Sequence, residues 1–342
     1  METGPRLTEK TLIAAIRARA MRRGSPALRL GIGDDCAVVR PAAGEEIIVT
    51  TDFSLEGVHF RREWHSPESV GHKCLARGLS DVAAMGARPV AAFLSMALPR
   101  ELVEARRGKA WAERFLDGML ALAERYKVPL AGGDTARSLG LACLDIVVLG
   151  AVKRRQAWLR SGAKAGDAIY VTGALGGASA ELLALVRKPR KFAGLSKDVE
   201  AHPHFFPEPR LTVAAKLAKT GLVRAAIDVS DGLSTDLGHI CEESGLAAEL
   251  DASALPVHQL AMEAEHAGLG RSALDLALHG GDDYELLFTA RSGARVPKEV
   301  AGIAVTRIGR MVARRKGRPQ MVLRDQDGRL TTLEPRGWEH FK

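Results

Sequence analysis

The stretch GIGDDCAVV, residues 31–39, joins a glycine turn to two adjacent carboxylates and then to a strand-like run. It follows the strand-like ALRLGI, and its opening is typical of the glycine-rich turn that holds phosphate after a β-strand. Asp34 and Asp35 stand where phosphate oxygens would lie, and like charges repel each other. Because divalent cations between acids and phosphate would remove that repulsion, we expect this loop to contact phosphate through metal ions.

Acids beside small residues recur in turns along the rest of the chain. Aspartate also favours turns and helix caps, and this alternative would account for any single position. The doublets and the neighbouring Gly-Gly pairs favour one shared site for hard cations, of which Mg²⁺ is the common one. The acids are Asp52, Asp81, Asp134, Asp228, Asp231, Asp282 and Asp283, in the motifs TTD, LSD, GGDT, IDVSDG and GGDDYEL.

Other nucleotide and catalytic motifs are missing from the sequence. There is no GxxxxGK[ST] loop, no GxSxG elbow and no HExxH pair, and GIGDDC lacks the third glycine of a dinucleotide fingerprint. The motif GALGGA, residues 173–178, is interpreted as a packing turn that opens a helix. The acidic turns therefore carry most of the functional signal.

Composition is that of an ordinary globular protein, with 46% apolar and 26% charged residues. No apolar run is long enough for a membrane helix, and the four cysteines form no CxxC pair. We therefore expect a cytoplasmic protein. The formal charge of +8 includes one basic cluster, RMVARRKGR at 310–318. With only 5% aromatic residues, we interpret that cluster as a solvated surface and expect no nucleic-acid partner, although the positive field would attract small anions.

Strand-like and helix-like segments alternate in two blocks, which predicts two α/β or α+β domains, residues 1–150 and 151–342. The run IIVTT at 47–51 is typical of a buried strand, and residues 101–127 have the spacing of one long amphipathic helix. Residues 187–210 are rich in Pro and Lys and are interpreted as a surface excursion. In parallel α/β sheets ligands bind at strand ends, where several of the acids would lie.

Seven motifs then occur in the order of one known family: GIGDDCAVV, TTDFSLEGVHF, LARGLSDVAAMGARP, LAGGDTARS, WLRSGAKAGDAIYVTG, AIDVSDGLSTDLGHI and GGDDYELLFT. Over about residues 8–342 the chain closely resembles the thiamine-monophosphate kinases, in the superfamily of aminoimidazole-ribonucleotide synthetase. The resemblance implies an N-terminal α/β domain that dimerises through a shared β-barrel and a C-terminal α/β domain. It also implies ATP-dependent phosphorylation of thiamine monophosphate to thiamine diphosphate, with several Mg²⁺ ions and a homodimer.

The resemblance further implies roles for individual residues. The implied metal ligands are Asp35, Thr50, Thr51, Asp52, Asp81, Asp134, Asp228 and Asp231. The implied nucleotide contacts are Gly133, Asp134, Arg160, Ser230 and Tyr126, and the implied substrate contacts are His59, Asp282 and Trp338. Asp282 is one methylene shorter than the Glu that the family often has there.

Some of these residues have simpler interpretations that the sequence leaves open. His59 would be an ordinary surface histidine, Arg160 a turn residue, Tyr126 a packing residue and Trp338 an anchor of the chain end. Arginine nevertheless suits nucleotide phosphate because its guanidinium is planar and always charged. A flat indole would in turn pack on a thiamine ring.

The expected chemistry requires no catalytic side chain. The acceptor is a phosphate monoester with a second pKa of about 6, so it is largely dianionic and already nucleophilic at neutral pH. We therefore expect direct in-line transfer without a phosphoenzyme, helped by metal ions that neutralise the reactants.

Competing functions remain within the superfamily and outside it. A C–N bond-forming synthetase is one. A selenophosphate synthetase would need a Cys that residues 1–30 lack, and a hydrogenase-maturation relative would end in a Cys-bearing tail, unlike EPRGWEHFK. A non-catalytic Mg²⁺ or Ca²⁺ module is the alternative from another class, but it has no use for Arg160 or the Gly-Gly turns.

Overall fold

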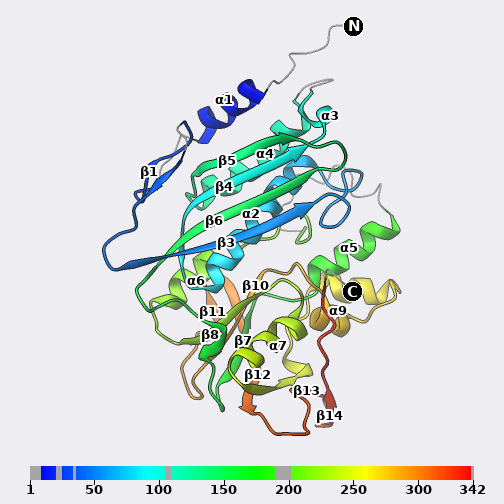
Figure 1. The fold of residues 1–342 in the computed structure, drawn as a ribbon. Coiled ribbons are helices and arrows are strands. Elements are labelled where there is room, and N and C mark those ends of the chain that lie inside the picture. Colours follow the sequence, from blue (N-terminus) through cyan, green and yellow to red (C-terminus); the bar gives the residue numbers. More distant parts are fainter. Residues whose placement is uncertain (1–8, 21–24, 34–35, 105–108, 189–201, 340–342) are drawn as a thin grey trace. The chain divides into compact units, whose positions relative to one another are not determined.

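The computed structural model describes residues 9–20, 25–33, 36–104, 109–188 and 202–339 of the chain. Helices and strands form two compact units, which confirms the predicted two-domain α/β fold class (Figure 1). The described residues of the first unit lie within 1–82 and 88–155, and those of the second within 83–87, 156–188 and 202–339. The boundary predicted near residue 150 stays a prediction.

The first unit is built on a four-stranded sheet with the order β3-β6-β4-β5. Strands β4 and β5 are parallel and the other neighbours are antiparallel. The strands are β3 (Glu45–Leu55), β4 (Arg88–Leu98), β5 (Leu130–Arg137) and β6 (Cys143–Lys153). The remaining elements are α1 (Glu9–Ala20), β1 (Leu28–Leu30), β2 (Val38–Val39), α2 (Pro67–Ala84), α3 (Arg100–Val103) and α4 (Trp111–Arg125).

Helix α2 covers one face of this sheet, where Gly78 faces Ile146 and Val148 of β6. Both β6 residues are fully buried, as are the apolar residues that α4 presents every three or four positions. One helix was expected over 101–127, but α3 ends at Val103 and α4 begins at Trp111. The long-helix prediction is wrong because Glu104 and Ala110 have extended backbones, and the Glu113 carboxylate accepts the Ala110 N–H (2.8 Å) to start a new helix.

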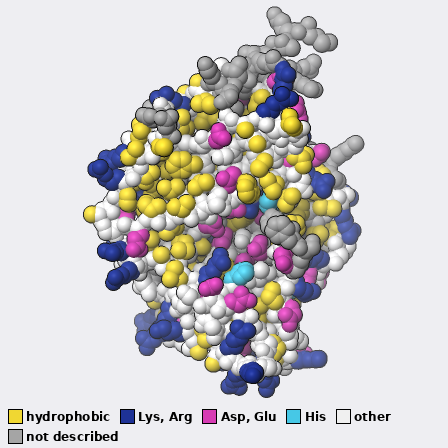
Figure 2. Space-filling model, viewed as in Figure 1, with side chains coloured by type: hydrophobic (Ala, Val, Ile, Leu, Met, Phe, Trp, Pro, Cys, Tyr) yellow, Lys and Arg dark blue, Asp and Glu magenta, His cyan; other side chains and the backbone are white. Residues whose placement is uncertain are grey.

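The other face of the sheet is apolar and partly open. Val49 and Phe53 of β3 are 64% and 56% exposed, so the prediction that residues 47–51 form a buried strand is wrong for this face. Figure 2 shows hydrophobic side chains gathered there. Within the described residues the sheet does not close into a barrel. The barrel shared between two chains stays a prediction.

The second unit is built on a sheet with the order β14-β13-β9-β12-β7-β10-β8, with β11 paired to β12. Its strands are β7 (Ala168–Thr172), β8 (Val223–Val229), β9 (Leu246–Asp251), β10 (Glu285–Ala290), β11 (Glu299–Val300), β12 (Ile303–Ala313), β13 (Met321–Arg324) and β14 (Leu330–Thr332). Its helices are η1 (Arg160–Gly162), α5 (Gly177–Arg187), α6 (Leu211–Ala218), α7 (Leu233–Glu243), η4 (Ala252–Ala254), α8 (Gln259–His266) and α9 (Ala273–His279). Only β9 and β13 are parallel among these strand pairs, so the ligand-at-strand-end argument for parallel sheets does not apply here.

Helix α7 packs its apolar side against this sheet. Leu233, Leu237 and Ile240 are fully buried in one cluster with strand residues such as Ile227 and Ile308. This packing fixes the β8–α7 turn, which carries several of the acids.

The predicted surface excursion at 187–210 is only partly described, because residues 189–201 lie outside the described ranges. At its end, His204, Phe205 and Phe206 are buried, so for these residues the surface prediction is wrong.

Two further findings concern the whole of the described chain. No described helix has the length and apolar composition needed to span a membrane. All four cysteines are free thiols, and Cys74 and Cys241 are buried.

Candidate active site

In the first unit, three of the expected ligands lie between β3 and α2. Thr50 and Asp52 are two residues apart on β3 and therefore point to the same face of the sheet, toward α2. The Thr50 hydroxyl donates to the carboxylate of Asp81 on α2. From the same helix, Arg77 donates to Asp52 Oδ1 (2.7 Å) and to the carbonyl oxygen of Phe53 (2.7 Å). Helix and strand together thus hold two carboxylates, one hydroxyl and one guanidinium.

The Asp52 carboxylate lies in an environment that disfavours its charged form. Burial raises its pKa to about 6, and the charges of Asp81 and Asp145 act in the same direction, against the guanidinium of Arg77. Because burial disfavours the charged carboxylate, a bound cation would stabilise the ionised form.

Thr51 does not join this group. Its side chain points to the opposite face of the sheet, where its hydroxyl donates to Asp145 Oδ1 of β6 (2.7 Å). Asp145 was missed by the sequence argument because it lies inside the strand motif ACLDIVVLGAV rather than in a glycine turn.

Gly133 and Asp134 lie on β5, beside β4. Gly133 has a φ of +146°, and a Cβ there would lie 1.9 Å from the carbonyl oxygen of Leu94, so only glycine allows this approach. Asp134 is exposed, and its Oδ1 accepts the N–H of Thr135 (2.8 Å). The Thr135 hydroxyl is buried without a hydrogen-bond partner in the described structure.

His59 and Tyr126 lie at the ends of other elements of this unit. The His59 Nδ1 accepts the Leu55 N–H (3.0 Å) just after β3, which leaves the proton of the neutral ring on Nε2. Tyr126 follows α4, with the guanidinium of Arg125 5.5 Å from its ring centre. The implied ligand Asp35 lies outside the described residues. The binding roles of these three residues stay predictions.

In the second unit, the β8–α7 turn is held by an aspartate that the sequence argument did not single out. Asp236 Oδ2 accepts the N–H groups of Ser230 (3.1 Å), Asp231 (3.2 Å) and Gly232 (3.0 Å). Burial raises the pKa of Asp236 well above its usual range, and the charges of Asp228 and Asp231 add to this. Its position in the first turn of α7 was the available signal, because acids there bind free N–H groups.

The adjacent residues Asp282 and Asp283 have different hydrogen-bond partners. The Asp282 N–H donates to the Ser230 carbonyl oxygen (2.8 Å), and the Tyr284 hydroxyl donates to Asp282 Oδ1 (2.8 Å). His204 Nδ1 lies 3.7 Å from Asp282 Oδ2. Asp283 is half-buried, and its carboxylate instead accepts the Gly176 N–H (2.7 Å) at the start of α5. Asp282 thus belongs to the turn, whereas Asp283 caps a helix.

The chain end is bound to the same turn. The Trp338 N–H donates to the Asp231 carbonyl oxygen (3.0 Å), and the Gly337 N–H donates to the Thr235 hydroxyl (3.1 Å). The structure therefore brings Ser230, Asp231, Asp282 and Trp338 into one backbone network. Arg160 is exposed on η1, where its carbonyl oxygen accepts from the Ser244 hydroxyl (2.8 Å), and it makes no described contact with this network.

The predicted ligands are oxygen donors, which is the ligand type that Mg²⁺ prefers. Within the described residues, no three His, Cys, Asp or Glu side chains gather closely enough to enclose a metal ion. Mg²⁺ does not require such a cage, because it keeps waters and takes one or two carboxylates plus substrate phosphates. The donors here are carboxylates and hydroxyls, which are oxygen ligands that suit this cation.

The two-unit fold and the acid-bearing motifs are features of one class of two-domain proteins. The family models for the AIR synthase related protein match here, the N-terminal domain at residues 33–152 and the C-terminal domain at residues 164–322. Within that class, the chain belongs to the thiamine-monophosphate kinase family. It is 36% identical to the thiamine-monophosphate kinase of Rhodopirellula baltica, over 97% of each chain.

Two solved structures share the fold. The crystal structure of thiamine-monophosphate kinase from Stenotrophomonas maltophilia has a TM-score of 0.78 and 39% identity, covering 96% of this chain and 99% of the other. The structure of AaThiL complexed with AMPPCP and TMP has a TM-score of 0.74 and 30% identity, covering 97% of each chain.

Proposed function

We propose that this protein transfers the γ-phosphoryl group of ATP to thiamine monophosphate and so forms thiamine diphosphate and ADP. The observation that carries the proposal is the full-length similarity to AaThiL, whose solved structure holds AMPPCP and TMP. The acid-rich turns support it, because two anionic reactants require positive charge between them.

The residues of each unit have distinct tasks in this proposal. In the first unit, Asp52, Asp81 and Thr50 form one group of Mg²⁺ ligands. Of the other predicted ligands, Thr51 and Asp134 lie outside this group and Asp35 lies outside the described residues. In the second, Asp228 and Asp231 are ligands, and Asp236 holds their turn in place. Bound Mg²⁺ supplies charge neutralisation and orients the phosphates.

Other side chains of the chain orient the reactants. Gly133, Ser230, Tyr126 and Arg160 contact the nucleotide, and Arg160 is exposed and therefore free to reach a phosphate. His59, Asp282 and Trp338 contact the thiamine moiety. The acceptor phosphate attacks directly, because its second pKa of about 6 makes it a dianion at neutral pH.

We also propose a homodimer in which a second copy covers the open face of the first unit's sheet. Val49 and Phe53 are more than half exposed there, beside partly buried Ile47, Phe93 and Leu149. An apolar face of this kind is unfavourable in water unless it is covered. The four free thiols accord with a reducing compartment, and we propose the cytoplasm.

The direct test is incubation of the protein with ATP, Mg²⁺ and thiamine monophosphate, followed by chromatographic separation of the products. Thiamine diphosphate and ADP in equal amounts are expected. Incubation with labelled ATP but without acceptor should leave the protein unlabelled. A competent phosphoenzyme would exclude direct transfer, and metal binding without turnover would favour the non-catalytic alternative.

A further inference from the structure

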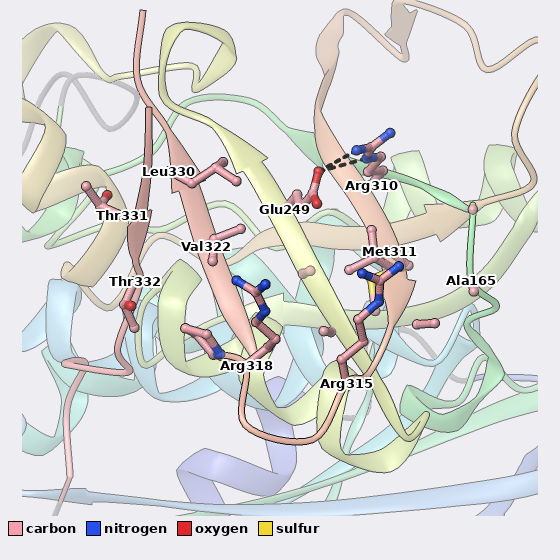
Figure 3. Close-up of a pocket in the computed structure, with 16 residues that line it drawn as sticks. Ala165, Glu249, Arg310, Met311, Arg315, Arg318, Val322, Leu330, Thr331 and Thr332 are labelled. Carbon is pink, nitrogen blue, oxygen red and sulfur yellow. Dashed lines mark hydrogen bonds and ion pairs between the residues drawn. The ribbon is translucent and has the colours of Figure 1, made fainter. Parts of the chain in front are cut away.

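A cavity of about 720 Å³ lies on the sheet of the second unit, among β9, β12, β13 and β14 (Figure 3). Its volume is within the range of small-molecule sites. On this sheet β9 is separated from β8, the strand that carries Asp228, by three other strands, so the two lie about 19 Å apart. Within this unit the cavity is therefore distinct from the acidic turn that follows β8.

The strand order explains why a basic loop borders this cavity. Strand β9 lies between β12 and β13, so the chain that joins those two strands must cross the end of β9. The crossing segment, residues 314–320, contains most of the basic cluster of the sequence. The fold thus places a run of positive charge over the first residues of β9.

A tight turn within the crossing segment pairs two arginines. The Arg318 N–H donates to the Arg315 carbonyl oxygen (3.1 Å), and Gly317 supplies the positive φ of +75°. The ends of such a turn lie within about 7 Å of each other. Figure 3 shows that both side chains extend from the turn in the same direction, over the strands.

The charge of these two arginines is not compensated. Glu249 is the only acid among the described residues that line the cavity. Its Oε2 already accepts from Arg310 (2.6 Å) and lies 3.4 Å from Arg324. Neither Arg315 nor Arg318 forms an ion pair with any described residue. Two guanidinium groups therefore face the cavity with their donors available for an anion.

The strands beneath offer an apolar surface. Ala247, Val322 and Leu330 line the cavity, and Leu330 is 48% exposed. The hydroxyl-bearing residues Thr331 and Thr332 lie beside them on the edge strand. A ligand that matches this lining has an anionic group at one end and a flat apolar body at the other.

We propose that this cavity binds a small organic phosphate, with the phosphate between Arg315 and Arg318 and the ring against Val322 and Leu330. Paired guanidinium groups suit phosphate because each donates two parallel N–H bonds. None of the described residues that line the cavity is aromatic and able to stack on a base, so a small molecule fits better than a nucleic acid.

Calorimetric titration in EDTA tests the proposal with three probes: inorganic pyrophosphate, ADP and thiamine diphosphate. Without metal ions the acidic turns repel phosphate, so binding reports the basic cavity. ADP or thiamine diphosphate should bind about tenfold more tightly than pyrophosphate because of the apolar floor. The two organic probes distinguish a nucleotide from the reaction product as the ligand.

Matched double variants locate the binding. Arg315→Ala/Arg318→Ala should weaken binding of the organic probe by about tenfold or more, since two charged donors are lost. Arg314→Ala/Lys316→Ala removes the same charge from the same loop outside the cavity and should change binding by about twofold at most. Circular dichroism checks that both variants are folded.

Three results would overturn the proposal: no binding of any probe in EDTA, equal affinity for pyrophosphate and both organic probes, or equal loss in the two double variants. The last would show a diffuse electrostatic field rather than a site. Because these measurements involve no turnover, failure here is distinguishable from failure of the proposed kinase activity.

Discussion

The Nε2 atom of His279 lies 2.7 Å from the Nη2 atom of Arg336, which belongs to the segment that leads to Trp338. Arginine only donates, so Nε2 must accept, and Nδ1 carries the proton toward the Ser234 hydroxyl (2.7 Å). Burial lowers the pKa of His279 to about 4, and Arg336 and Arg271 add to this against Asp275. The imidazole thus links α7 to the chain end in its neutral form.

Stability should therefore fall in acid. The unfolded His279 has a pKa near 6.5, so its contribution is complete above that pH and is lost as pH falls toward 4. The loss amounts to about 3 kcal/mol for this group. Urea unfolding of wild type and His279→Gln from pH 7 to 4 measures it, and the variant should show a flatter pH dependence. His239→Gln, at an exposed histidine, serves as control, and an unchanged slope in His279→Gln would contradict the assignment.

Asp236 should be required for the shape of the β8–α7 turn rather than for contact with metal. Asp236→Ala leaves three N–H groups without their acceptor and should lower the free energy of unfolding by about 3 kcal/mol. Asp236→Asn keeps an acceptor oxygen on a side chain of the same size and should lower the free energy of unfolding by about 1 kcal/mol. Denaturant titration compares the two, and equal losses would argue against the hydrogen-bonded turn.

Asp52→Asn should reduce turnover by about a hundredfold or more while the fold is kept, because the metal loses a charged ligand. The half-saturating Mg²⁺ concentration should rise in parallel. Thermal unfolding should change little, since burial already raises the pKa of this carboxyl to about 6 and an amide can still accept from Arg77. Asp117→Asn, at a half-buried acid paired with Arg19 and Lys109, is the control. Turnover of Asp52→Asn at the wild-type rate would exclude Asp52 from the metal site.

A charge on the open sheet face should convert the proposed dimer to monomers. Val49→Lys/Phe53→Lys places two ammonium groups where we propose that the second copy packs. Light scattering coupled to gel filtration should give half the wild-type mass for this variant. Met262→Lys changes an exposed apolar residue on α8 in the other unit and should leave the mass unchanged. A wild-type protein that is already monomeric would refute the dimer.

The features that the sequence predicted best depend on residues that are close together in the chain. The acid-bearing motifs singled out Asp52, Asp231 and Asp282, and the family resemblance added Thr50 and Trp338. The expected turn position is wrong for Asp52, which lies inside strand β3. The opposite orientation of Thr51 follows from the two-residue period of a strand, which the argument did not apply. The break near Glu104 was missed because helical spacing continues through it.

Other features depend on contacts between distant segments and have no local signature. Nothing in the sequence near Trp338 indicates that its N–H bonds to Asp231, or that Arg336 meets His279. The splitting of the Asp282–Asp283 doublet arises because Asp283 meets the start of α5, more than a hundred residues earlier. The sequence predicted that residues 47–51 are buried because they are apolar. An apolar strand has the same sequence pattern whether its own chain or a second copy covers it.

Tyr284 should position the carboxylate of Asp282 for the substrate. The backbone has positive φ at both residues, +68° and +51°, and the tyrosine hydroxyl donates to Asp282 Oδ1 (2.8 Å). Tyr284→Phe removes only that donor, so the KM for thiamine monophosphate should rise about fivefold, with kcat and the KM for ATP nearly unchanged. Tyr170→Phe, on β7 in the same sheet, is the matched control and should leave all three constants unchanged. A loss confined to kcat would instead place Asp282 at the transferred phosphoryl group rather than at the thiamine moiety.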